Sequence, residues 1–161
     1  MGAGNEELVS DNFKYPGIYR GTVLDNDDPD MFGRIKVNVF GIFDNLPAAA
    51  IPWATPAMPV GSGAGSDFGN LSIPEVGSNV FVFFEGMDVY QPVFFAEAAD
   101  GVRGLPTESQ TNYPYRKVTK TKNGIVIIID DSSKEIYVNH PSGSYIKIDG
   151  SGNIVIQGTT I

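Results

Sequence analysis

The chain has 161 residues and no cysteine, carries a formal net charge of −8, and contains 19 glycines and 11 prolines. This composition excludes disulfide bonds and thiolate metal sites, and the frequent turn residues favour a β protein over a helical one. No stretch approaches the ~20 apolar residues of a membrane span, and the first residues lack the pattern of a signal peptide, so we expect folding in a cytoplasm.

The acidic charge is concentrated in the first part of the chain. Residues 1–100 carry fourteen Asp or Glu against four Lys or Arg, which gives −10, whereas residues 101–161 carry five against seven, which gives +2. Nucleic-acid binding depends on the neutralisation of phosphates by Lys and Arg. We therefore expect no nucleic-acid partner.

Residues 1–14 are predicted to form a polar arm, and the first strand begins near Tyr15. Polar and apolar residues alternate over residues 15–24 and again over residues 33–40, so the two strands can pair as a hairpin. The acidic turn between them, residues 25–30, lacks the glycine and the terminal glutamate of a calcium-binding loop. A solvated turn is therefore the preferred interpretation.

A proline-rich segment, residues 46–59, and a glycine-rich segment, residues 61–66, precede two further strands at residues 80–85 and 91–96. The glycine-rich segment lacks the lysine and the following helix of a phosphate-binding loop. The strand at residues 80–85 is apolar on both faces, which is typical of the middle of a sheet or barrel. Four or five closely spaced strands within residues 15–100 predict a small closed OB-like barrel.

After a linker at residues 101–117, residues 118–161 predict short strands separated by turn sequences such as Asn123-Gly124 and Asp149-Gly150. Apolar and polar residues alternate there, and the apolar pairs recur at offsets of ten and then eight residues. The inward-facing residues are expected to be Ile136, Val138, Ile146, Ile148, Ile154 and Ile156.

A thin sheet with one apolar face is at best marginally stable by itself, so this C-terminal segment needs a partner. Burial of its apolar face against identical copies of the chain would provide one. The alternative is that these strands fold back on the preceding domain as an ordinary extension.

Several segments follow one another in the order of a known module. The residues that carry the resemblance are Gly33, Arg34, Ile35, Val37, Trp53, Pro74, Gly77, Val80 and Pro92. They resemble the N-terminal OB-like barrel of phage central spike proteins and of the related valine-glycine-repeat proteins of type VI secretion, and the resemblance covers residues 15–161. Individually these residues also fit structural roles, and Trp53 is expected to bury its ring in the barrel.

The resemblance implies an all-β homotrimer in which the barrel is followed by a short intertwined triple-stranded β-helix, or β-prism, over residues 118–161. It implies a structural central spike or hub-spike adaptor of a contractile injection machine, a phage tail baseplate. Such a protein docks on hub or tail-tube proteins, carries a separate tip protein at its C-terminal end, and meets the host envelope mechanically. The expected location is the virion, assembled in the host cytoplasm, with a secretion or extracellular injection particle as the alternative.

We expect neither catalysis nor a cofactor. His140 is the only histidine, so a two-histidine metal site within one chain is impossible. A strand-end histidine that caps backbone groups or faces solvent is preferred over a metal site on a threefold axis. The linker is too short for the muramidase domain that some family members insert. Two alternatives stay open: a carbohydrate-binding OB module using Tyr15, Tyr19 and Tyr90, and a cell-wall hydrolase with acid/base groups in a cleft.

Overall fold

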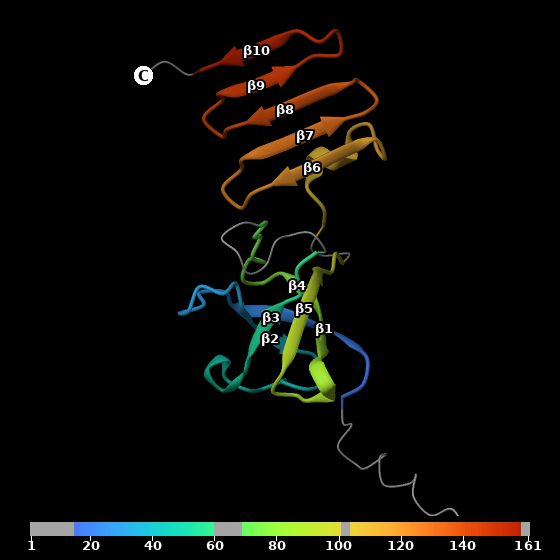
Figure 1. Cartoon of the computed structure of the whole chain (residues 1–161). Helices are drawn as coiled ribbons and strands as arrows, with labels where there is room; N and C mark the ends of the chain where they lie inside the picture. The colour runs from blue at the N-terminus through green and yellow to red at the C-terminus, as the bar shows by residue number, and fades with distance from the viewer. Residues whose placement is uncertain (1–14, 60–68, 101–103, 159–161) are drawn as a thin grey trace, which may run out of the picture. The chain divides into compact units, whose positions relative to one another are not determined.

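The computed structural model describes residues 15–59, 69–100 and 104–158, and the chain divides into two compact units, Met1–Ala99 and Asp100–Ile161 (Figure 1). In these ranges the chain forms strands and three short 3-10 helices, so the expected all-β class is confirmed. The polar arm at residues 1–14 and the glycine-rich residues 61–66 lie outside the described residues.

Five strands of the first unit close into a barrel in the order β1-β2-β3-β5-β4. They are β1 (Ile18–Asp25), β2 (Ile35–Val39), β3 (Trp53–Pro56), β4 (Asn79–Phe84) and β5 (Pro92–Glu97), with η1 (Ala48–Ala50) before β3 and η2 (Glu85–Met87) after β4. Neighbouring strands pair antiparallel except β3 and β5, which are parallel. The closed barrel confirms the prediction, and β4 lies between two other strands, as its two apolar faces indicate.

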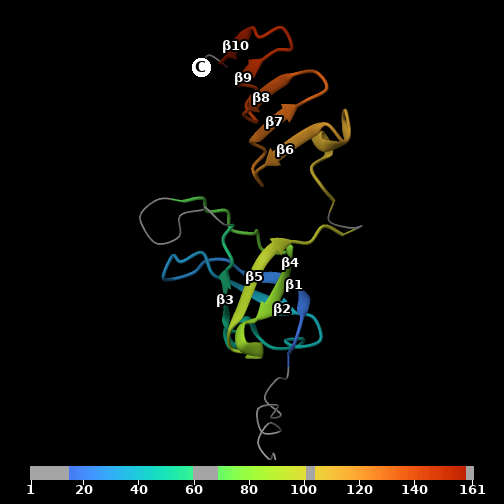
Figure 2. The same cartoon turned by 45° about the vertical axis from the view of Figure 1, so that its right-hand side comes forward.

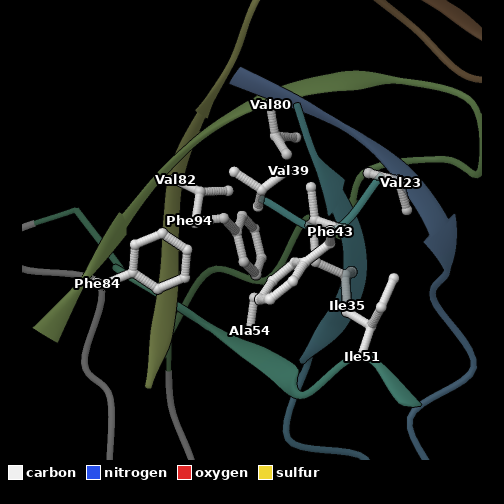
Figure 3. Packing of buried hydrophobic residues seen from close by; sticks show 11 residues of the cluster. Val23, Ile35, Val39, Phe43, Ile51, Ala54, Val80, Val82, Phe84 and Phe94 are labelled. Carbon is white, nitrogen blue, oxygen red and sulfur yellow. The ribbon is translucent and has the colours of Figure 1, made fainter. Parts of the chain in front are cut away.

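The barrel is filled by apolar side chains from all five strands and from the segment between β2 and β3 (Figure 3). Alternation along each strand produces this core, because every second residue points inward. The ring of Phe43 meets the ring of Phe84 edge-on, with centroids 6.0 Å apart. The core residues are Val23, Ile35, Val37, Val39, Phe43, Ile51, Ala54, Val80, Val82, Phe84 and Phe94.

A glycine in the middle of β1 allows β1 and β2 to approach closely. A Cβ atom at Gly21 would lie 2.5 Å from Cγ1 of Val37 and 2.6 Å from the carbonyl oxygen of Asn38. Glycine inside a strand often marks such a close approach of neighbouring backbone. The tight curvature of this small barrel therefore depends on the missing side chain.

The second unit is an antiparallel meander of five strands in the order β10-β9-β8-β7-β6 (Figures 1 and 2). Its elements are η3 (Thr107–Gln110), β6 (Arg116–Lys120), β7 (Val126–Asp130), β8 (Glu135–Asn139), β9 (Tyr145–Ile148) and β10 (Ile154–Gln157). Four hairpin turns connect the strands. Residues with positive φ occur in each turn: Gly124, Lys134, Gly143 and Gly152.

Part of the segment expected as a linker is regular structure. Residues 107–110 form η3, and β6 begins at Arg116, two residues before the expected start of the strand segment. Arg116 and Lys117 belong to β6 because they lie opposite Asp130 and Ile129 of β7. Arg116 forms an ion pair with Asp130, and Lys117 forms one with Asp131.

Candidate functional site

Two rows of aligned apolar side chains cross the meander and form its apolar face. One row joins Ile129, Ile136, Ile148 and Ile154 through direct cross-strand pairing, and the other joins Ile127, Val138, Ile146 and Ile156. All six residues expected to face inward in the C-terminal segment lie in these rows. Their role as the core of a trimer stays a prediction.

Ile127 and Ile129 extend the apolar face beyond the six residues expected from the sequence. Residues 125–129 read Ile-Val-Ile-Ile-Ile, so both phases of β7 are apolar and the alternation that marks the other strands is hidden. Pairing with β8 shows which residues of β7 lie on the apolar face, because Ile127 lies opposite Val138 and Ile129 lies opposite Ile136.

The apolar face is exposed in the single chain. Exposed fractions range from 37% for Val138 to 75% for Ile156 among the seven most exposed members, and Ile148 is half-buried. Together they expose on the order of 600 Å² of apolar surface, at the top of the range of about 300–600 Å² for the largest patch on a typical monomer. Such a surface indicates a site for association.

The apolar face ends at β7. On β6 the residues that continue the two rows are Lys117, opposite Ile129, and Thr119, opposite Ile127. At the other edge of the sheet, Ile154 and Ile156 of β10 are its most exposed members, at 68% and 75%. The surface suited to association therefore covers β7 to β10.

The opposite face of the meander is mixed. It carries charged groups that pair with one another, and also the apolar residues Val118, Val126, Ile128 and Val155. Asp130 is 1% exposed and accepts hydrogen bonds from Asn112 and Arg116, both 2.9 Å, and from the backbone amides of Ser132 and Ser133. The Asn112 amide, the backbone amides and the Arg116 guanidinium lower the pKa of Asp130 to about 2. These contacts hold the turn after β7 against β6.

Further along this opposite face, Lys147 pairs with Glu135 at 2.6 Å, and the rings of Tyr137 and Tyr145 lie 5.3 Å apart. The groups come from β8 and β9, which are neighbouring strands. Cross-strand pairs of this kind stabilise a sheet. The charged and tyrosine side chains of the opposite face therefore have partners on their own sheet, in contrast to the rows of the apolar face.

In the barrel, the turn between β1 and β2 contains an ion pair whose carboxylate is buried. Asp28 is 6% exposed, and its carboxylate accepts bonds from Nε of Arg34 at 3.0 Å and from Nη2 of Arg34 at 2.6 Å. It also accepts the backbone N–H groups of Asp30, Phe32 and Arg34. The Arg34 guanidinium and these amides hold the pKa of Asp28 well below its usual range. The turn expected to be merely solvated is therefore organised around one buried carboxylate.

Trp53 does not fill the barrel, contrary to expectation. Its neighbour Ala54 is buried in the core, so Trp53 lies on the outer side of β3 and is half-buried. The guanidinium of Arg34 lies 5.8 Å from its ring centroid and the ammonium of Lys36 lies 5.0 Å from it. Cations over an aromatic face are attracted by its quadrupole. The interior is filled by Phe43, Phe84 and Phe94 and their neighbours instead.

The remaining module residues shape turns and the core. Gly33 takes φ 75°, and a Cβ there would lie 3.0 Å from the side chain of Leu71. The turn containing Pro74 and Gly77 joins the start of β4 to β1, because the Pro74 carbonyl accepts the Asn26 amide and the Gly77 N–H donates to Val23. The other four, Ile35, Val37, Val80 and Pro92, are buried. All of these positions serve the fold.

His140 lies in the turn between β8 and β9. Its Nδ1 accepts the backbone N–H of Ser142 at 3.1 Å and lies 2.8 Å from the Ser142 hydroxyl. This arrangement agrees with a histidine that caps backbone groups. Within the described ranges there is no group of three or more His, Asp or Glu side chains that could hold a metal ion.

The three tyrosines of the carbohydrate-binding alternative do not form a common platform. Tyr15 and Tyr19 each pack against Phe84, with ring centroids 5.6 Å apart, and the Tyr19 hydroxyl donates to the carbonyl of Pro16. Tyr90 is 77% exposed and lies between β4 and β5.

In the part of the chain that the structure describes, no helix is long and apolar enough to cross a membrane.

The barrel and its internal contacts define an OB domain, and comparison with protein families identifies its kind. Residues 19–97 match the family model described as the type VI secretion system/phage-baseplate injector OB domain. The matched residues extend from β1 to the end of β5, so the barrel belongs to that family. No match was found among curated proteins.

Proposed function

We propose that this chain is the homotrimeric central spike, or hub-spike adaptor, of a phage tail baseplate. Two features support the proposal: the barrel belongs to the injector OB family, and the meander carries an apolar face that nothing within its own sheet covers. The exposed apolar face is the observation that supports the trimer most strongly. A sheet one layer thick needs a second layer to bury it.

In the proposed trimer, three copies turn their apolar faces toward a common axis and form a three-sided prism. The rows on β7 to β10 supply the interior, and the paired charges of Glu135 and Lys147 face water. Residues 118–161 of the three chains would then form the short intertwined triple-stranded β-helix that the resemblance implies. The barrel would dock on hub or tail-tube proteins, and a separate tip protein would cover the C-terminal end.

The proposed role is structural and requires neither catalysis nor a cofactor. The spike would be part of the virion, assembled in the host cytoplasm, and would meet the host envelope mechanically. A secretion or extracellular injection particle is the alternative location, because the matched family covers both type VI secretion systems and phage baseplates.

The mass of the intact protein in solution tests the proposal. The chain has a mass of 17.3 kDa, so a trimer has three times 17.3 kDa, about 52 kDa, by light scattering. A monomer at micromolar concentration would contradict the trimer. A dimer would indicate two sheets stacked face to face in a sandwich, which would also contradict it.

A further inference from the structure

The loop between β1 and β2, residues 26–34, presents two large apolar side chains to solvent. Met31 is 86% exposed and Phe32 is 70% exposed, and the side chain of Leu71, 60% exposed, lies beside the loop at Gly33. In Figures 1 and 2 this loop stands away from the barrel strands. Exposed apolar side chains that gather at one place indicate an interaction site.

The backbone of this loop is held in place by the buried Asp28. Its carboxylate binds the N–H groups of Asp30, Phe32 and Arg34, at 3.1, 2.9 and 3.2 Å, and the guanidinium of Arg34 closes the loop from the other side. The same guanidinium lies 5.5 Å from the ring centroid of Phe32. Met31 and Phe32 are therefore presented on an ordered backbone, and binding requires little further ordering.

The same loop holds Met31 in a strained backbone conformation. Its φ is 57°, in the left-handed region that favours glycine, and its N–H donates to the carbonyl of Asp28 at 3.0 Å. The bonds to Asp28 therefore fix the backbone from which the exposed side chain of Met31 projects.

The negative charge of the loop indicates which kind of partner surface can bind it. Residues 25–34 contain four aspartates and one arginine, a net charge of −3, and residues 1–100 carry −10. A second acidic barrel would repel this loop, and nucleic acid would repel it too. A protein surface with Lys or Arg side chains around an apolar pocket is complementary to it.

We propose that Met31 and Phe32 insert into an apolar pocket of a different protein subunit in the same particle, and that Lys or Arg side chains line the rim of that pocket. This inference rests on the proposed function, since it requires a particle in which the chain has neighbours. It assigns the docking of the barrel to one loop. The ion pair of Asp28 with Arg34 acts as the support of this docking loop rather than as a contact.

Photo-cross-linking in complete particles tests the proposal directly. Phe32→p-benzoylphenylalanine is expected to join this chain to a second protein, at a peptide that contains Lys or Arg. Tyr90→p-benzoylphenylalanine is the control, because Tyr90 is similarly exposed, at 77%, but belongs to another loop. A cross-link at position 32 only between copies of this chain, or no cross-link there, would overturn the proposal.

A double variant separates the failure of this inference from that of the proposed function. Met31→Ser with Phe32→Ser is expected to reduce the amount of this chain in purified particles at least tenfold, whereas Tyr90→Ser is expected to leave it unchanged. The melting temperature and the mass of the soluble protein should match the wild type in both. Wild-type chain missing from particles would refute the proposed function. Wild-type and double-variant chain at equal amounts in particles would refute the docking loop alone.

Discussion

Replacing Ile146 by glutamine is expected to break the proposed trimer, because this residue lies in the middle of one apolar row. Ile146 pairs with Val138 on one side and Ile156 on the other, and it is 50% exposed in the single chain. Burying that exposed half, roughly 90 Å² of surface, contributes about 2 kcal/mol per chain at about 25 cal/mol per Å².

The substitution occurs in all three chains, so its effect on assembly is about three times larger. A loss of about 6 kcal/mol corresponds to a change on the order of four powers of ten in the equilibrium constant for trimer dissociation. Burial of the glutamine amide without a partner would add to this loss. Sedimentation equilibrium over nanomolar to micromolar concentrations measures the change.

Lys147→Gln is the matched control, because it introduces the same side chain one position further, on the opposite face. Lys147 pairs with Glu135, and their side chains are 34% and 29% exposed, so the loss of this surface pair should cost little. Aspartate at 147 would be a poorer control, since it would place a carboxylate beside Glu135. Equal weakening of the trimer by both glutamine variants, or an unchanged trimer in Ile146→Gln, would refute the assignment of the two faces.

Three further predictions concern the separate units. Residues 1–99 alone should fold as a monomer, measured by light scattering and thermal melting, because the barrel has its own core. Gly21→Ala should lower the free energy of unfolding of the barrel by about 1–3 kcal/mol in urea, because the new Cβ would collide with Val37. Unchanged stability would contradict the close packing of β1 and β2. The meander should lose stability as pH falls from about 4 toward 2, because Asn112 and other groups lower the pKa of Asp130 below its unfolded value of 3.8. Asp130→Asn should be less stable at neutral pH and should lack this dependence in acid unfolding.

Most of the barrel could be predicted from the sequence, because the strands at residues 15–24 and 33–40 alternate clearly and the turns contain glycine and proline. The strand at residues 80–85, apolar on both faces, was expected in the middle of the sheet, and the structure has β4 there, between β1 and β5. No strand was expected at β3, which lies in the proline-rich segment, residues 46–59. In the C-terminal strands, the sequence also indicated which residues share a face wherever a charged residue or a tyrosine alternated with isoleucine. Pairing then placed each expected inward residue on one face.

Contacts between distant or differently oriented side chains could not be predicted in this way. The aspartates of the turn before β2 look alike in sequence, and only the fold buries Asp28 and leaves Asp30 exposed. Trp53 was expected in the core because it is large and apolar, but β3 turns Ala54 inward and the tryptophan outward. Ile127 and Ile129 were missed because periodicity carries no information in an uninterrupted apolar segment.

Each strand from β7 to β10 adds two residues to the apolar face, and this regularity sets a rule for how the meander can change in length. Inserting or deleting a whole hairpin lengthens or shortens the apolar rows without changing their cross-section. Inserting one residue inside a strand reverses the facing of every residue after it, up to the next turn. The length of the meander is therefore adjustable only in discrete units, and the turns that follow β7, β8 and β9 are the places where such units can be added or removed.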